Sequence, residues 1–282
     1  MLVYLNGNYV QDGAATISVL DRGFIFGDGV YEVWRVVRGK LFEGERHLRR
    51  LQRGLGELRI TPPALADADE LPKIARRLLT ENGLLEGEAT LYVEITRGTA
   101  PRSHAFPPAN TAPTVFAMAK PLTLHHEVRA AGAKVITTPD VRWLRCDIKT
   151  VQLLPNVMAQ QQAVEHDALE AVFIRDGVVT EGSHTNVFGV IDGELRTHPQ
   201  NHFVLPGVTR DVVLEVAAAC GIPVRQEAMR EQDLERLSEL FLSGTTTDVM
   251  PVVRIDDRPV GNGKPGPIAQ RLYDGLRKRL DA

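Results

Sequence analysis

The sequence contains few cysteines, few aromatic residues and no excess of charge of one sign, and each scarcity excludes a class of protein. Its 282 residues include only two cysteines, Cys146 and Cys220, too few for a disulfide framework or a cysteine-based zinc site. Lys plus Arg number 33 against 36 Asp plus Glu, so charge gives no reason to expect nucleic acid or an anionic membrane as partner. We therefore expect no metal and a reduced, cytoplasmic setting.

Long apolar runs and targeting patterns are also lacking. No apolar run approaches the ~18 residues that a membrane-spanning helix needs. The N-terminus, residues 1–7, has neither the basic start nor the apolar stretch of a signal peptide. The chain also lacks a G-x-S-x-G sequence, a P-loop, and a G-x-G-x-x-G following a strand. The familiar signatures of serine hydrolases and of nucleotide-binding folds are therefore absent.

The remaining composition is that of a globular protein, and its periodicity predicts helices mixed with strands. Leucines spaced 3, 4 and 3 apart predict a buried stripe on the first helix, and alternation predicts half-buried strands. Asn6-Gly7, Asp176-Gly177 and Asp192-Gly193 are typical of hairpin turns, and Asp28-Gly29 is a further turn candidate. The expected helices are 45–58, 69–82, 157–165, 210–220 and 267–280; the expected strands are 89–96, 113–119, 135–138, 148–154, 171–174 and 186–191.

This order of elements indicates an α/β fold of mixed α+β character in two lobes. The pattern weakens between residues 120 and 132, which we interpret as a linker. The expected organisation is a smaller N-terminal α/β domain over 1–119 and a larger C-terminal α/β domain over 133–282.

Lys149 is the first candidate for chemistry. It lies between Ile148 and Val151 at the start of an expected strand, where burial would lower the pKa of the amine and favour the form that attacks an aldehyde. The alternative is an edge-strand lysine that discourages aggregation, and spacing alone favours that alternative.

Three other segments carry polar groups at turns. Glu181 ends a strand before Gly182 and can face a cleft, or be an ordinary solvated turn residue. Residues 205–210 open a helix, where N–H groups favour a phosphate, while Thr209 can equally cap its own helix. Residues 243–247 supply small side chains and hydroxyls, which suit phosphate oxygens or an ordinary turn.

A loop over residues 97–104 carries an arginine and a histidine two positions apart. In an extended loop Arg102 and His104 fall on the same side, so together they can clamp a carboxylate. The alternative is a pair of solvated loop residues, which the spacing alone favours.

The order of these segments along the chain is more informative about function than any single segment. The series 21–33 (DRGFIFGDGVYEV), 47–51 (HLRRL), 147–149 (DIK), 179–183 (VTEGS), 206–210 (PGVTR) and 243–246 (SGTT) resembles the fold-type IV pyridoxal-phosphate family of aminotransferases over nearly the whole chain. The segments 96–104 (TRGTAPRSH) and 142–149 (RWLRCDIK) are similar to its D-amino-acid transaminase subgroup. The resemblance implies a two-domain fold with the cofactor in the cleft between domains.

The resemblance also implies a role for each matched residue. Lys149 would bind pyridoxal 5'-phosphate as a Schiff base and move the substrate proton, and Glu181 would keep the pyridine nitrogen protonated. Tyr31, Arg102 and His104 would hold the substrate carboxylate, with the Arg102 loop reaching in from the partner subunit of a homodimer. The residues implied around the cofactor are Lys149, Glu181, Arg50, Thr209, Val208, Thr245, Thr246 and Ser183.

The expected reaction is ping-pong transamination of a D-amino acid such as D-alanine with a 2-oxo acid such as 2-oxoglutarate. The same fold leaves open an L-branched-chain aminotransferase or an aminodeoxychorismate lyase, both disfavoured by the Arg102/His104 pair. A non-catalytic cofactor-binding protein is a remote alternative. One departure from the subgroup is His184, which interrupts a run of hydroxyl residues and would narrow specificity, shift the pH optimum or point to solvent.

Overall fold

The computed structural model describes residues 1–281, which form two compact units. Unit 1 contains residues 1–123 and 148–153, and unit 2 contains residues 124–147 and the chain from Leu154 onward. The sequence pattern assigns residues 148–153 to the C-terminal domain, whereas their contacts place them in unit 1. Lys149 is therefore carried by unit 1.

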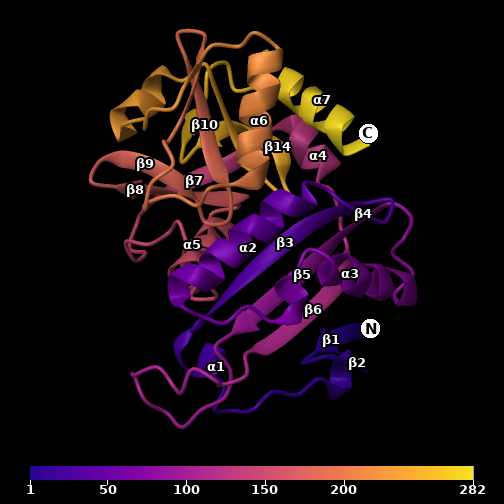
Figure 1. The fold of residues 1–282 in the computed structure, drawn as a ribbon. Coiled ribbons are helices and arrows are strands. Elements are labelled where there is room, and N and C mark those ends of the chain that lie inside the picture. Colours follow the sequence, from indigo (N-terminus) through magenta and orange to yellow (C-terminus); the bar gives the residue numbers. More distant parts are fainter. Residues whose placement is uncertain (282) are drawn as a thin grey trace. The chain divides into compact units, whose positions relative to one another are not determined.

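Unit 1 is an antiparallel sheet in the order β2-β1-β6-β5-β3-β4 (Figure 1). The Asn6-Gly7 hairpin is confirmed, since both residues have positive φ between β1 and β2. The elements are β1 (Leu2–Leu5), β2 (Asn8–Gln11), α1 (Arg22–Phe26), β3 (Gly29–Val37), β4 (Lys40–Leu41), α2 (Gly44–Leu58), α3 (Glu70–Glu81), β5 (Glu88–Thr96) and β6 (Thr114–Pro121), with short 3₁₀ turns at Asp12–Ala14 and Ala64–Ala66.

Helix α2 runs along β3, and its leucine stripe closes the core of unit 1 (Figure 1). Leu48, Leu51 and Leu55 are buried against Trp34 of β3, as the spacing predicts. Each buried leucine contributes about 1.5–3 kcal/mol relative to an exposed one, so the stripe fixes the rotation of the helix. The same helix carries Arg50, whose side chain is 9% exposed and pairs with Glu32 of β3.

Unit 2 is built on a mixed sheet in the order β12-β11-β10-β13-β14-β7-β8-β9, with β15 paired to β14. Helices α6 and α7 pack beside one another on β13 and β14, and α5 packs on β7 and β8 (Figure 1). The elements are α4 (His126–Ala131), β7 (Ala133–Pro139), α5 (Leu154–Glu165), β8 (Glu170–Arg175), β9 (Val178–Gly182), β10 (Asn186–Ile191), β11 (Glu194–Thr197), α6 (Val208–Ala219), β12 (Val224–Arg225), a 3₁₀ turn (Glu231–Arg236), β13 (Glu239–Gly244), β14 (Asp248–Ile255), β15 (Arg258–Pro259) and α7 (Pro267–Asp281).

The sheet of unit 2 curls back on itself. Strand β9 is last in the sheet order and β10 is third, yet the two strands contact one another and are joined by a turn over residues 183–185. Within this turn, Gly182 N donates to Thr185 O at 2.7 Å. The curl therefore brings Glu181 at the end of β9 next to Asn186 at the start of β10.

Two sequence expectations are wrong. The expected strand 148–154 does not form, because only Thr150 makes an isolated bridge, to Val30, and α5 already begins at Leu154. Thr209 does not cap α6, because Gly207 occupies the N-cap and Thr209 lies in the first helical turn. The turn candidate Asp28-Gly29 lies where the chain passes from α1 into β3. Within residues 1–281, no helix combines the length and apolarity that crossing a membrane requires.

Candidate active site

Lys149 is held by backbone hydrogen bonds beside β3 of unit 1. Tyr31 N donates to Lys149 O at 3.0 Å, and Val151 N donates to Gly29 O at 3.1 Å. The half-buried amine lies over the aromatic ring of Tyr31, with Nζ 4.2 Å from the ring centroid. The expectation of a desolvated environment for the amine thus has a local basis, and Tyr31 is its immediate neighbour.

A buried charge cluster lies on the same part of unit 1. Arg50 Nη2 donates to Glu32 Oε1 at 2.7 Å and Arg50 Nε donates to Glu32 Oε2 at 2.8 Å, while His47 Nδ1 is 3.0 Å from Glu32 Oε1. Burial alone would raise the pKa of Glu32, but Arg50 and His47 hold it well below its usual range. Burial also lowers the pKa of His47, and the nearby charge of Lys149 adds to this effect. The cluster fixes the Arg50 guanidinium in one orientation against Glu32.

Arg102 and His104 lie on an exposed loop, and both side chains lie close to the Phe26 ring. The Arg102 guanidinium carbon is 5.4 Å from the ring centroid, and the His104 and Phe26 rings are 5.6 Å apart. Within residues 1–281, no hydrogen bond, ion pair or ring contact joins either side chain to Lys149 or Tyr31. The chain therefore brings the two expected carboxylate ligands together, at a place where solvent or another molecule can reach them.

The loop that carries this pair is firmly anchored. Arg22 donates to the carbonyl oxygen of Ser103 at 2.6 Å and pairs with Asp28, which also binds Arg97 through two hydrogen bonds. Burial opposes ionisation of Asp28, but the two arginines lower its pKa below the ordinary value. Arg97 in turn stacks on Phe106, 3.7 Å from the ring centroid. The position of the loop is thus set by unit 1 itself.

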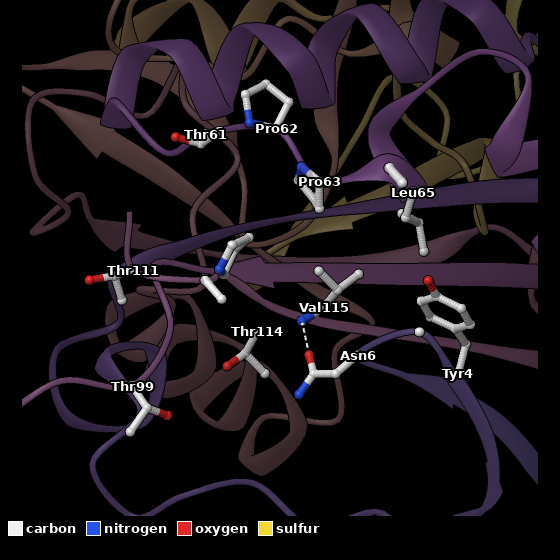
Figure 2. A pocket seen from close by; sticks show the side chains of 14 residues that line it. Tyr4, Asn6, Thr61, Pro62, Pro63, Leu65, Thr99, Thr111, Thr114 and Val115 are labelled. Carbon is white, nitrogen blue, oxygen red and sulfur yellow. Dashed lines mark hydrogen bonds between the residues drawn. The ribbon is translucent and has the colours of Figure 1, made fainter. Parts of the chain in front are cut away.

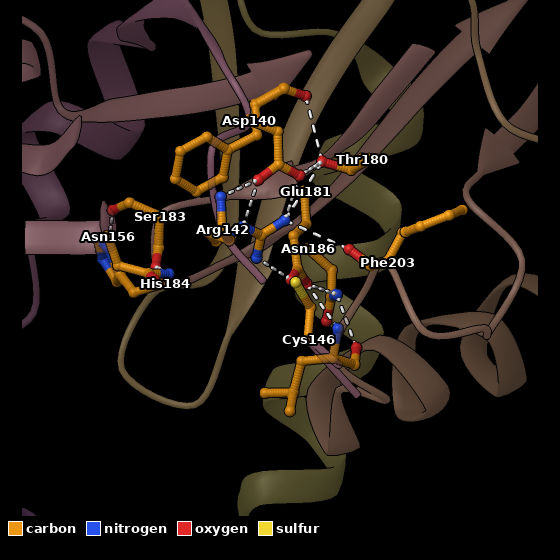
Figure 3. Close-up of polar contacts among 12 residues, drawn as sticks. Asp140, Arg142, Cys146, Asn156, Thr180, Glu181, Ser183, His184, Asn186 and Phe203 are labelled. Atoms are coloured by element: carbon orange, nitrogen blue, oxygen red, sulfur yellow. Dashed lines mark hydrogen bonds and ion pairs between the residues drawn. The ribbon is translucent and has the colours of Figure 1, made fainter. Parts of the chain in front are cut away.

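Glu181 is buried in unit 2 among three hydrogen-bond donors (Figure 3). Arg142 Nη1 donates to Oε1 at 2.5 Å, while Leu205 N at 2.9 Å and Asn186 Nδ2 at 3.1 Å donate to Oε2. Burial raises the pKa of Glu181 to about 7, although Arg142 acts in the opposite direction. The alternative of a solvated turn glutamate is therefore wrong.

Arg142 is itself held in place by a second buried carboxylate. Asp140 accepts from Arg142 Nε at 2.9 Å and from Arg142 Nη2 at 2.8 Å (Figure 3). Arg175 Nη2 lies 3.0 Å from Asp140 Oδ1, the oxygen that also accepts from Arg142 Nε. The Arg142 guanidinium also stacks over Phe173 at 4.3 Å. The charges alternate from Arg175 through Asp140 and Arg142 to Glu181, which restricts the position of the last carboxylate.

A set of anion-binding groups surrounds Asn186 in unit 2. Gly207 precedes α6 without any side-chain cap, so the first N–H groups of the helix, including those of Val208 and Thr209, have no acceptor within the helix. A Cβ atom on Gly207 would lie 1.9 Å from Asn186 Oδ1, so only glycine allows this approach. Opposite Asn186 in the sheet is Ser243, whose buried hydroxyl has no hydrogen-bond partner among residues 1–281.

The turn after Ser243 completes this set. Thr245 and Thr246 follow at the end of β13 and are partly exposed. An uncapped helix N-terminus, an unpartnered buried hydroxyl and two further hydroxyls fit a ligand with several acceptor oxygens, such as a phosphate. The residues of unit 2 thus fit the two ends of pyridoxal phosphate: Glu181 fits the ring nitrogen, and the α6 turn fits the phosphate.

Ser183 lies beside a buried carboxylate. Its hydroxyl donates to Glu170 Oε1 at 2.5 Å and is buried with that carboxylate. Sequence reasoning missed Glu170, Arg142 and Asn186 as functional residues. For Asn186 a signal existed, because it is the one polar residue in the otherwise apolar strand NVFGVI.

A separate pocket of about 690 Å³ lies on unit 1 and contains none of the expected site residues (Figure 2). Threonine hydroxyls and prolines line it, and Asn6 Oδ1 beside it accepts from Val115 N at 2.8 Å. Among its lining residues only Tyr4 has a titratable side chain, and burial raises the pKa of that phenol. The pocket thus lacks the groups that the chemistry at Lys149 and Glu181 requires.

Each unit thus carries groups of the kind that pyridoxal phosphate requires: a half-buried lysine in unit 1, and a buried carboxylate and an uncapped helix N-terminus in unit 2. We therefore compared the chain with known proteins. Residues 29–255 match the family described as Amino-transferase class IV, so the chain belongs to the class IV aminotransferases. Pyridoxal phosphate is the cofactor of this family, and one of the similar solved structures contains pyridoxamine 5'-phosphate.

Among curated relatives, the chain is similar to two D-alanine aminotransferases. It is 39% identical to that of Staphylococcus epidermidis over 280 residues, covering 99% of this chain and 98% of the relative. It is 37% identical to that of Bacillus licheniformis over 280 residues, covering 99% and 97%.

Among solved structures, the fold matches branched-chain amino acid aminotransferases. The Escherichia coli enzyme superposes with a TM-score of 0.89 at 25% identity, covering 98% of this chain and 93% of the other. The Thermoproteus uzoniensis enzyme superposes with a TM-score of 0.87 at 26% identity, covering 100% and 95%.

Proposed function

We propose that this protein transfers the amino group of D-amino acids, such as D-alanine, to a 2-oxo acid such as 2-oxoglutarate. The observation that carries the substrate class is the Arg102/His104 pair, which one anchored loop holds close to the Phe26 ring. A guanidinium and an imidazole so close together can both donate to an α-carboxylate. The whole-length similarity to D-alanine aminotransferases supports the same choice.

When bound, pyridoxal phosphate supplies an electron sink for the charge left on the substrate Cα. Lys149 Nζ would bind the cofactor covalently, and the same amine would take the substrate Cα proton and return it. Glu181 would keep a proton on the ring nitrogen. Arg142 and Asn186 hold the Glu181 carboxylate in one position through hydrogen bonds.

Several groups are proposed to bind the phosphate. Arg50, fixed by Glu32, supplies positive charge, and the N–H groups of α6 at Val208 and Thr209 supply donors. The hydroxyls of Thr245 and Thr246 complete the proposed set. Ser183 contributes less directly than the resemblance implies, because its hydroxyl proton is engaged by Glu170.

The carboxylate trap would be completed by a second copy of the chain. Exposed apolar side chains support a homodimer: Val19 and Phe24 in unit 1 are 73% and 71% exposed, and Leu154, Val157 and Met158 are exposed on α5. Such surfaces mark interfaces between proteins. We propose that Arg102 and His104 of one subunit join Tyr31 of the other around the substrate carboxylate.

A cytoplasmic location is part of the proposal, supported by the two cysteines, which are both free thiols. The reaction that we propose consumes and produces small amino and oxo acids only, without a metal.

The absorbance spectrum of the purified protein tests the function. We expect a yellow band from the bound cofactor that disappears on adding D-alanine and returns on adding 2-oxoglutarate, while L-leucine has no effect. Bleaching by L-leucine alone would favour branched-chain transamination, the activity named for the similar solved structures, and would overturn the role of Arg102 and His104. A protein that takes up no cofactor would refute the proposal as a whole.

A further inference from the structure

Besides Glu181 and Asp140, unit 2 contains another buried carboxylate, that of Glu170. It has no part in the chemistry described so far. Glu170, the first residue of β8, has no exposed surface. One carboxylate oxygen accepts from Ser183 N at 3.0 Å and Ser183 Oγ at 2.5 Å, and the other accepts from Thr185 Oγ1 at 2.9 Å and His184 N at 3.3 Å. A single carboxylate thus binds every residue between Gly182 and Asn186.

The turn that Glu170 binds joins the two residues at the ring-nitrogen end of the site. Glu181 precedes the turn and Asn186 follows it, and the two are hydrogen-bonded at 3.1 Å. A Cβ atom on Gly182 would lie 2.2 Å from Thr185 Oγ1 and 2.9 Å from Glu170 Oε2, so the packing leaves no room for adjustment. Movement of the turn would therefore displace Glu181 from its position beside the cofactor.

His184 connects this buried carboxylate with solvent. Its Nδ1 atom lies 2.9 Å from Glu170 Oε2, while its side chain is 50% exposed. The other side chains around the turn are neutral: Ser183 and Thr185 on the turn itself, and Asn156 and Gln160 on α5. Burial would raise the pKa of Glu170, but His184 and Ser183 lower it below the ordinary value. His184 is thus the nearest source of positive charge for Glu170, and water can reach it.

We propose that Glu170 is a positioning residue for Glu181 and that His184 is its counter-charge, so that protonation of His184 tightens the hold of the protein on its cofactor. This inference rests on the proposed function, because it concerns the same ring-nitrogen contact. At a pH below the titration of the imidazole, ordinarily near ~6.5, the ion pair holds the turn. Above that pH the neutral imidazole leaves Glu170 with uncharged donors only.

The first test replaces Glu170 by glutamine and measures the dissociation constant of pyridoxal phosphate, together with thermal unfolding of the cofactor-free protein. Loss of a charge-assisted acceptor is expected to weaken cofactor binding about tenfold. The matched control is Glu165→Gln, an exposed carboxyl at the end of α5, which should change neither value. Wild-type cofactor affinity in E170Q would overturn the inference. Should E170Q fail to fold, Ser183→Ala combined with Thr185→Val removes two donors to the same carboxylate.

The second test replaces His184 by serine and follows cofactor affinity from pH 5.5 to pH 8. Relative to H184S, the wild-type protein should lose affinity as the pH rises, and the control His126→Ser should follow the wild type. A purely structural role of His184 would shift both ends of the pH range equally, and such parallel profiles would overturn the proposal. Failure of the proposed function is distinguishable, because the wild-type protein itself would then bind no cofactor.

Discussion

Replacing Glu181 by glutamine should alter the pH dependence of folding in a direction that the structure fixes. Burial raises the pKa of this carboxyl from 4.5 to about 7 in the cofactor-free chain. A group whose pKa is raised on folding stabilises the fold fully below its unfolded pKa, and that stabilisation is lost as the pH rises through the folded pKa. The difference between 4.5 and about 7 corresponds to about 3 kcal/mol, lost mainly between pH 4.5 and pH 7.

Urea unfolding of the cofactor-free protein measures this effect. Between pH 4.5 and pH 8 the wild-type free energy of unfolding should fall by about 3 kcal/mol relative to that of E181Q, since the amide does not titrate. The control Glu165→Gln should run parallel to the wild type. If the wild type instead gained stability over E181Q with rising pH, the Arg142 ion pair would outweigh burial, and the direction given above would be wrong.

The same variant tests the chemical role once the cofactor is bound. Removing one preorganised charge beside the reacting system commonly costs about 100-fold or more in rate. We therefore expect E181Q to react with D-alanine about 100-fold more slowly in single-turnover absorbance measurements. A rate close to that of the wild type would show that the ring nitrogen does not depend on this carboxylate.

Three other substitutions test the remaining roles. Lys149→Ala should lower turnover by ~1,000-fold or more and remove the yellow band. Retained multiple turnover would show that Lys149 is not the reacting amine. Lys120→Ala, at an exposed lysine, is the control. Arg102→Ala should raise KM for D-alanine about tenfold or more without bleaching the cofactor. Arg53→Ala is the control. Unchanged kinetics in Arg102→Ala would mean that the substrate carboxylate is bound elsewhere. Phe24→Ser should weaken self-association by about 2 kcal/mol or more in sedimentation experiments, whereas unaltered dimers would place the interface on another surface.

Regular elements were predictable where one periodicity dominated. The stripe of Leu48, Leu51 and Leu55 identified α2, because burial of one helix face is a local property of the sequence. Residues 148–153 look like a strand by the same criterion, with apolar residues at Ile148, Val151 and Leu153. They form none, because their backbone groups pair with β3 at isolated points instead of along a ladder.

The site was predictable in its reacting residues but not in their supports. Lys149 and Glu181 stand out because they lie in an ordered series of motifs that spans the chain. The partners of Glu181 do not follow from the local sequence. Arg142 is 39 residues away, and Asn186 becomes a partner only because the sheet curls. Hydrogen bonds of this kind are fixed by tertiary packing, which a local pattern does not encode.

The backbone contacts of Lys149 make the position of the reacting residue independent of the residues that would select the substrate. The lysine is located by main-chain atoms of Gly29, Tyr31 and Val151, and the side chains beside it play little part in fixing its backbone. Exchanging those side chains would leave the backbone of Lys149 where it is. Descendants of such a chain are therefore free to acquire new substrates by changing the loop around Arg102 while keeping the reacting amine unchanged.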